Sequence, residues 1–130
     1  MVRLFLLSGA IAGGLAVIFG AFASHALKSR LIERSLDIFE TGVRYQMYHA
    51  LALVLLGILL SLQAESNIWF NLSGIGFTLG ILTFSGSLYA LALLGIKWLG
   101  AVAPIGGAAF IVGWGSLAIA ALTTQFSSKL

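Results

Sequence analysis

Four long stretches without Asp, Glu, Lys or Arg dominate this sequence and restrict what it can fold into. They cover residues 4–27, 46–64, 66–96 and 98–128. A helix needs ~20 apolar residues to cross ~30 Å of hydrocarbon, and in lipid it satisfies its own backbone hydrogen bonds. We therefore predict an all-α integral membrane four-helix bundle, one domain over residues 1–130, with helices at about 4–25, 46–64, 72–94 and 99–122.

The composition agrees with lipid as the surrounding medium. Hydrophobic residues make up 60% of the chain and charged residues 8%, whereas soluble domains are about 25% charged. The sequence has no cysteine, which excludes disulfides, thiolate metal sites and cysteine nucleophiles. The net charge of +3 is scattered, and without a basic stripe we expect no nucleic-acid binding.

The first apolar stretch has a second interpretation as a removable signal peptide. Met1-Val2-Arg3 has the character of a basic n-region, and Ala21-Phe22-Ala23 fits a small-x-small cleavage site. The apolar run is longer than the ~7–15 residues of a signal peptide's apolar region. We therefore expect a retained transmembrane helix.

Residues 29–45 form the one strongly charged segment. Its apolar residues recur at helical spacing, and its charged residues take the other side. This pattern predicts a short amphipathic helix at the membrane interface, between the first and second transmembrane helices. The alternative is that the segment runs straight into the second helix, because Gly42 weakens a helix without forcing a break.

Basic residues predict the orientation of the chain. The segment after the first helix and the turn before the fourth carry five Lys or Arg, against Arg3 and Lys129 on the opposite side. The five are Lys28, Arg30, Arg34, Arg44 and Lys97. Because cytoplasmic loops are enriched in Lys and Arg, we expect a multi-pass plasma membrane protein with loop 1 in the cytoplasm and both termini outside.

Small residues predict how the helices pack. The 16 glycines lie mostly inside the apolar runs, and many recur every three or four residues. Such stripes let membrane helices approach closely. We expect the first, third and fourth helices to make the tightest contacts; the alternative is that glycine is merely tolerated there. The packing glycines are Gly9, Gly13, Gly20, Gly76, Gly80, Gly106 and Gly113.

Polar residues inside or beside the apolar runs are the candidates for function. The four helix ends that carry them lie on the same side of a four-span topology, so we expect one polar cluster in the cytoplasmic half. Its members are His25, Glu40, Arg44, Tyr45, Gln46, His49, Ser87 and Tyr89. The favoured interpretation is that they hydrogen-bond helix ends and bind lipid or a partner. The alternatives are metal or haem ligation by His25 and His49, and a proton relay through His49 and Glu40.

Several blocks of the sequence are similar to a known family. Residues 20–27, GAFASHAL, resemble the GAFGAHAL block of the YgdD-like family of small inner-membrane proteins, which includes transmembrane protein 256 of animals. Residues 39–51 resemble its second block closely, and residues 85–89, 104–107 and 113–114 resemble the later ones. The departure at Ala23-Ser24 exchanges small residues for small ones. The resemblance implies four membrane helices and a bacterial plasma membrane, and it implies no activity. It marks His25, Glu40, Arg44, Tyr45, His49, Ser87 and Tyr89 as family positions.

These observations favour a non-enzymatic accessory protein without cofactor or metal. Its expected partners are membrane lipid, a membrane-protein partner or a second copy of the chain. One alternative is a small-solute or proton transporter acting as an oligomer, which needs a polar lining through the full membrane thickness. Another is a membrane cofactor binder that uses His25 and His49.

Overall fold

The computed structural model describes residues 1–63 and 67–124, which form four long helical rods. The first rod is α1 (Val2–Phe22) with the π-helical turn η1 (Ala23–Leu27), and the second is α2 (Glu33–Ser61). The third joins α3 (Ile68–Gly80), the π-helical turn η2 (Ile81–Ser85) and α4 (Gly86–Leu94). The fourth joins the 3-10 turn η3 (Lys97–Ala101) to α5 (Ala103–Thr123). Each rod has 26 to 29 residues, enough to span a bilayer, so the predicted all-α bundle of four apolar helices is confirmed.

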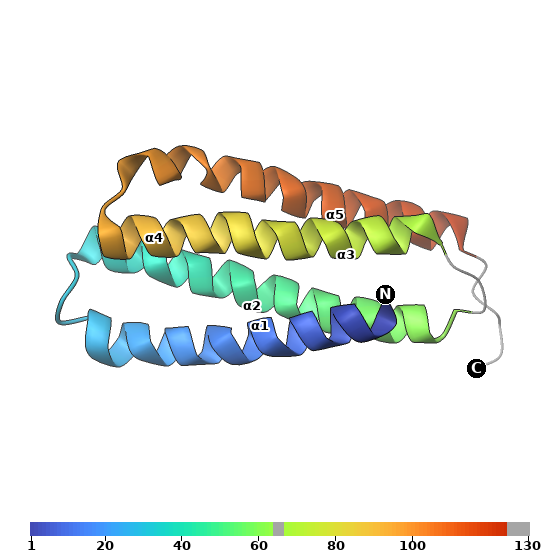
Figure 1. The fold of residues 1–130 in the computed structure, drawn as a ribbon, viewed down its shortest axis with the longest axis horizontal. Helices are drawn as coiled ribbons and strands as arrows, with labels where there is room; N and C mark the ends of the chain where they lie inside the picture. Colours follow the sequence, from blue (N-terminus) through green and yellow to red (C-terminus); the bar gives the residue numbers. More distant parts are fainter. Residues whose placement is uncertain (64–66, 125–130) are drawn as a thin grey trace.

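The rods run side by side, and their connections separate into two ends (Figure 1). One end holds the link 28–32 and the turn 95–102; we call it the basic end, because the five Lys and Arg named for orientation lie there or in the adjoining turns of α2. The opposite end holds Met1 and the C-terminus of α5. Lys129 and the acidic Glu65 lie outside the described residues, and the orientation in the membrane stays a prediction.

The prediction of a separate amphipathic helix between the first two rods is wrong. Its charged residues form the first turns of α2, which is continuous from Glu33, whereas we expected the second helix to start near residue 46. Phe39 is buried in a cluster with Leu27 and Ala92, so the amphipathic pattern marks a face that packs inside the bundle.

Gly42 lies within this continuous helix and suits the contact that it makes. A β-carbon at this position would come within 2.8 Å of the ring of Tyr89. The Gly42 carbonyl oxygen also accepts a hydrogen bond from Ser85 Oγ at 2.7 Å. The glycine therefore lets α4 approach α2 closely, and the helix is held straight through it by its neighbours.

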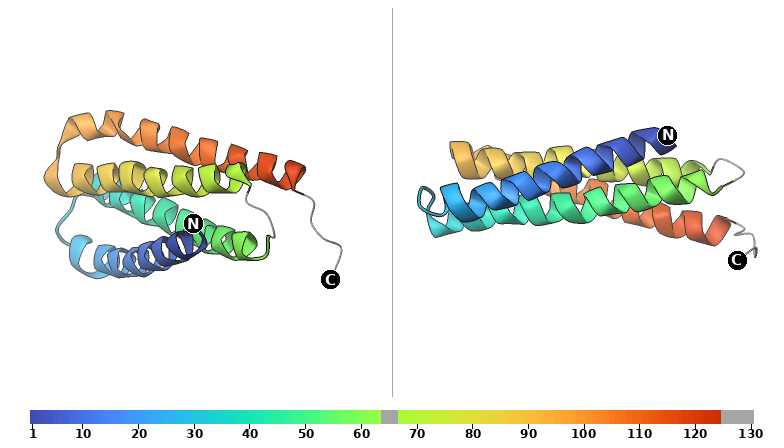
Figure 2. Two further views of the ribbon diagram at one scale, coloured as in Figure 1. Left: turned by 45° about the vertical axis from the view of Figure 1, so that its right-hand side comes forward. Right: turned by 90° about the horizontal axis from the view of Figure 1, so that it is seen from below.

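The first rod makes its closest backbone approach to α2 (Figure 2), and it reaches the third rod through the side chains of Phe5 and Phe19. A β-carbon on Gly9 would lie 2.8 Å from the carbonyl oxygen of Ala50, and Gly13 and Gly20 also face α2. In return, Gly57 of α2 accommodates the side chain of Leu6. We expected the tightest contacts among the first, third and fourth helices. The third and fourth do pair closely, but the first pairs with α2, because the leucine-rich α2 offers its own small residues at these points.

The third and fourth rods form the other close pair, through α3 and α5. A β-carbon on Gly76 would come within 2.9 Å of the Gly113 backbone. The ring of Phe110 occupies the space beside Gly80, and the backbone of Phe84 lies against Gly106. Since α2 contacts α3, η2 and α4, it joins this pair to α1.

The turn at the basic end has local causes. Gly95 ends α4 with φ of 66°, a left-handed conformation that glycine adopts without strain. Pro104 lies in the first turn of α5, where its missing N–H has no intrahelical partner to lose. Between them, Trp98 is 68% exposed, as expected for an indole at the headgroup level.

Candidate functional site

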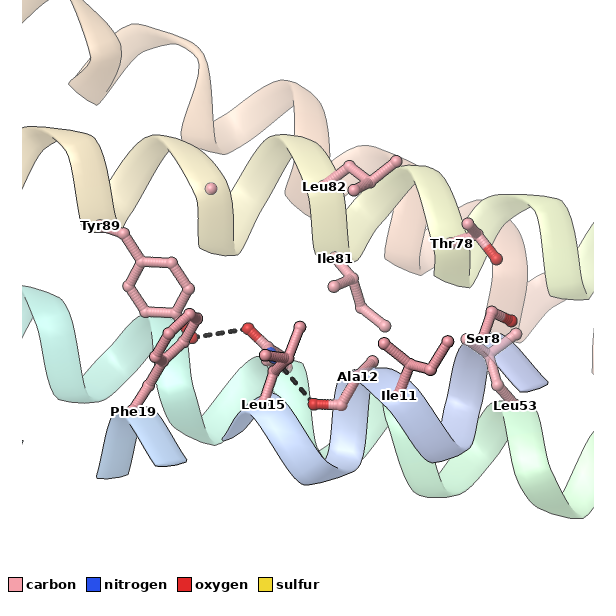
Figure 3. Close-up of a pocket in the computed structure, with 12 residues that line it drawn as sticks. Ser8, Ile11, Ala12, Leu15, Phe19, Leu53, Thr78, Ile81, Leu82 and Tyr89 are labelled. Atoms are coloured by element: carbon pink, nitrogen blue, oxygen red, sulfur yellow. Dashed lines mark hydrogen bonds between the residues drawn. The ribbon is translucent and has the colours of Figure 1, made fainter. Parts of the chain in front are cut away.

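A buried glutamine joins three of the rods. Gln46 of α2 donates from Nε2 to the carbonyl oxygen of Ala12 at 2.8 Å and accepts at Oε1 from the Tyr89 hydroxyl at 2.7 Å (Figure 3). Its side chain is 4% exposed. Because a polar group surrounded by hydrocarbon has no water as an alternative partner, these two bonds link α1 and α4 through α2.

The second polar centre is His49, also buried in α2. Its Nδ1 lies 2.7 Å from the Tyr45 carbonyl oxygen, and its Nε2 lies 3.1 Å from Trp114 Nε1 of α5. A carbonyl only accepts and an indole N–H only donates. Nδ1 therefore carries the proton, Nε2 accepts, and both ring nitrogens of a neutral imidazole are occupied.

Aromatic rings enclose this imidazole. The His49 ring stacks on Phe110, with centroids 3.5 Å apart and planes 10° apart. Phe77 lies 5.5 Å from His49 and 4.9 Å from Trp114, centroid to centroid. The hydrogen bond to Trp114, which is 48% exposed, thus borders an aromatic cluster that joins α2, α3 and α5.

The two histidines predicted as alternative ligands are placed differently. His25 is exposed on η1 at the basic end, whereas His49 is buried and already uses both nitrogens. Within residues 1–63 and 67–124, no group of three His, Cys, Asp or Glu side chains is arranged to hold a metal ion. In the described geometry, His25 and His49 are therefore not arranged to bind one metal ion or haem together.

The remaining members of the predicted cluster are dispersed. Arg44 is exposed and donates to Thr41 Oγ1 at 3.1 Å, while Glu40 is partly buried. Ser87 is buried and donates to the Phe84 carbonyl oxygen of its own helix. Tyr45 lies at the surface, 40% exposed. Within the described part of the chain, two pairs among the eight predicted residues are hydrogen-bonded: Tyr89 to Gln46 through their side chains, and the His49 ring to the backbone carbonyl oxygen of Tyr45.

Three residues important for this arrangement were missing from the sequence-based list. Trp114 supplies the partner of His49, and Ser85 bonds the α2 backbone. At the end opposite the basic end, Asn67 caps α3 and donates to Thr123 and Thr124. A signal was available for Trp114, because a tryptophan in the middle of an apolar run needs an acceptor for its N–H.

A groove lies on the side of the bundle where α1 faces the third rod (Figure 3). It holds about 370 Å³ and is lined by α1, by η2 with its flanking helices, and by α2. Most of the lining is apolar, including Ile11, Leu15 and Ile81, and the Gln46–Tyr89 pair also borders it. Because Ile11 is 54% exposed, the groove opens laterally toward the surroundings of the bundle.

The polar atoms in the groove are already paired. Ser8 Oγ donates to the Phe5 carbonyl oxygen at 3.2 Å, and Thr78 Oγ1 donates to that of Gly74 at 2.8 Å. Tyr89 and Gln46 bond to each other. The groove therefore presents apolar surface and few free donors to whatever occupies it.

The Gln46 link leads to a test by paired substitution. Gln46→Leu is expected to lower the free energy of unfolding by about 1–2 kcal/mol, because it removes two interhelical hydrogen bonds and leaves the Tyr89 hydroxyl without its acceptor. Tyr89→Phe removes the matching donor. The double variant should lose less than the sum of the two single losses. Thermal unfolding in detergent micelles measures all three, and strict additivity would show that the two side chains are not coupled.

Comparison with known proteins gives one consistent result. Residues 19–107 match a family described as "Protein of unknown function (DUF423)". The chain is 42% identical over 112 residues to a UPF0382 membrane protein of Staphylococcus haemolyticus, covering 86% of this chain and 89% of the relative. It is 40% identical to the UPF0382 membrane protein YwdK of Bacillus subtilis, over 92% of this chain and 97% of that relative. It is 37% identical to the UPF0382 inner membrane protein YgdD of Escherichia coli, over 92% of this chain and 90% of that relative. No solved structure gives a significant match.

Proposed function

The chain belongs to the DUF423 family of UPF0382 membrane proteins, and we propose that it is a non-enzymatic accessory protein that holds a lipid-like ligand in the groove between α1 and the third rod. The four apolar spans make it a multi-pass membrane protein. The name of its E. coli relative and the five basic residues at one end support a bacterial plasma membrane with that end in the cytoplasm.

The groove is the observation that carries the proposal. In a bilayer, a lateral opening lined by leucine and isoleucine is in contact with acyl chains rather than water. The paired hydroxyls and amide in its lining leave little to recognise a polar solute. An apolar molecule drawn from the membrane is therefore the ligand that this surface suits.

The polar network supports a structural role for the residues that first suggested catalysis. A proton relay needs a base with a free lone pair or a donor facing a substrate. Nε2 of His49 accepts from Trp114, and the Tyr89 hydroxyl donates to Gln46. Both groups hold helices together, which favours a protein without a catalytic step.

Transport is supported less well than ligand binding. A path for a small solute needs polar groups through the full thickness of the membrane. On α2, the buried polar side chains are Gln46 and His49, and the rest of the helix toward Ser61 is apolar. The groove itself opens sideways rather than from one end to the other.

A substitution that fills the groove tests the proposal. Gly86 lines the groove, and a β-carbon there would meet nothing within 4 Å. Gly86→Leu should therefore fold and occupy the ligand's space. After gentle detergent extraction, native mass spectrometry should find lipid-like molecules bound to the unmodified protein and less than half as much on the variant.

Gly14 provides the matched control for this experiment. A β-carbon on Gly14 also meets nothing within 4 Å, but this residue does not line the groove. Gly14→Leu should keep the bound molecules. The proposal would be contradicted if both variants retained the lipid-like molecules equally. It would also be contradicted if the unmodified protein carried only a co-purified protein or a metal.

A further inference from the structure

We infer that the groove takes an acyl chain of an anionic phospholipid whose headgroup lies at the basic end, between Lys28 and Lys97. This inference rests on the proposed function and adds the chemical class of the ligand. Three observations support it. Lys28 and Lys97 carry positive charge at the basic end, the groove lies below the level of these charges, and its interior lacks free polar groups.

Both walls of the groove lead to a lysine at the same end of the bundle. Along the first rod, Lys28 follows Phe19 of the groove by nine residues. The third rod ends at Leu94, and Lys97, the first residue of η3, follows Tyr89 by eight residues. Both lysines are exposed. Phe19 and Tyr89 are in edge-to-face contact, 5.1 Å apart, and so mark the groove's end nearer the lysines. An anionic group at the basic end would meet the ammonium groups of the link after η1 and of the turn before α5.

The other charges at the basic end leave these two lysines in excess. The first turns of α2 carry three carboxylates, matched in number by three arginines on α2 and the preceding link. The carboxylates are Glu33, Asp37 and Glu40, and the arginines are Arg30, Arg34 and Arg44. Lys28 follows the end of the first rod and Lys97 begins the fourth, and neither rod carries an acidic residue. The predicted orientation places them in the cytoplasmic leaflet, where anionic lipids attract basic side chains.

The depth of the groove suits a lipid tail below a charged headgroup. Trp98, beside Lys97, is strongly exposed and indicates the headgroup level. At ~1.5 Å per residue, the groove begins about 13 Å from Lys28 along the helix axis. The polar layer of one leaflet is only ~5–8 Å thick. The groove therefore lies wholly within hydrocarbon, where a phospholipid has its acyl chains.

The interior of the groove favours a tail over other apolar ligands. A mainly apolar ligand that carries polar groups on a ring would need hydrogen-bond partners for those groups at that depth. The Tyr89 hydroxyl and the Gln46 amide bond to each other instead, and the hydroxyls of Ser8 and Thr78 bond to their own helices. A saturated chain needs none of these groups, and its charged end lies where the lysines are.

The test compares lipid selectivity rather than lipid binding alone. The full chain is placed in nanodiscs of equimolar phosphatidylglycerol and phosphatidylethanolamine, released into mild detergent, and its bound lipids are identified by native mass spectrometry. The unmodified protein should retain phosphatidylglycerol in preference. The double variant Lys28→Ala/Lys97→Ala should reduce this preference by roughly 25-fold, because each basic residue near an anionic surface contributes about fivefold in affinity.

Three variants and one competition experiment serve as controls. Arg3→Ala removes one positive charge at the opposite end of α1 and should leave the preference unchanged. Lys28→Arg/Lys97→Arg keeps both charges and should retain it. Gly86→Leu should reduce both lipids together. Excess inorganic phosphate should not displace the bound phosphatidylglycerol, which separates a whole lipid from a free anion.

The outcomes separate this inference from the proposed function. Lipid that is bound without preference and lost in Gly86→Leu would overturn the inference and leave the proposed function standing. An unchanged preference in the double lysine variant would also overturn it. A lipid-free dimer that Gly86→Leu converts to monomer would assign the groove to a second copy and overturn both.

Discussion

Gly76→Val is expected to separate α3 from α5 and to give a larger loss of stability than the other single substitutions considered for this protein. A β-carbon on Gly76 would come within 2.9 Å of the Gly113 backbone and of the Ala109 carbonyl oxygen. Those atoms are backbone, so no side-chain rotation relieves the clash. Overpacking a core costs about 1–3 kcal/mol when side chains can adjust, and we expect at least the upper part of this range where a helix must move.

Thermal unfolding in detergent micelles, followed by helical circular dichroism, measures the effect of Gly76→Val. Gly115→Val is the matched control, because Gly115 lies on the partner helix α5 and an added β-carbon meets nothing within 4 Å. It carries the same intrinsic helix penalty without the clash. Equal melting temperatures for the two variants would mean that α3 and α5 do not pack through Gly76.

Replacing His49 is expected to have the second largest effect. His49→Ala removes the ring that stacks on Phe110 and leaves the Trp114 indole without an acceptor. Removing a buried aromatic ring costs about 3–5 kcal/mol, and we expect a loss near the lower value because an imidazole is smaller than a phenyl ring. The melting temperature in micelles and the emission of Trp114 should both change.

His49→Phe separates packing from hydrogen bonding at the same position. It keeps a ring against Phe110 but provides no acceptor for the Trp114 indole N–H. The expected loss in free energy of unfolding is therefore that of the unpaired N–H alone, about 1–3 kcal/mol. The bound lipid of the folded protein should be unaffected, because His49 does not line the groove. Loss of lipid from a stably folded His49→Phe protein would show that the histidine belongs to the binding site.

The charged segment illustrates how sequence periodicity fixes a face but not its neighbour. The spacing of Leu36, Phe39 and Val43 indicated an apolar side, and the structure has one. A pattern of this kind is the same whether the apolar side meets lipid or another helix. In the structure the apolar side meets other helices, because Phe39 is buried against Leu27 and Ala92. The segment is part of one continuous helix, α2.

The polar residues show a similar division. Gln46 and His49 are unusual within an apolar run, and from that alone each was expected to have a hydrogen-bond partner. Apart from the Tyr45 carbonyl oxygen, which lies one helical turn from His49, their partners are far away in the chain. Ala12, Tyr89 and Trp114 are 34, 43 and 65 residues distant. The rotation of each helix about its axis decides these pairs, and no local pattern encodes that rotation.

The sequence by itself determined the medium, the four spans and the shared end of the basic residues, because hydropathy and charge belong to each segment without reference to the others. Only the tertiary structure decided that α1 pairs with α2 and α3 with α5. Small residues occur on all four helices, and a stripe of glycine admits any helix that comes close. The choice among partners depends on how whole faces fit, down to the ring of Tyr89 against Gly42.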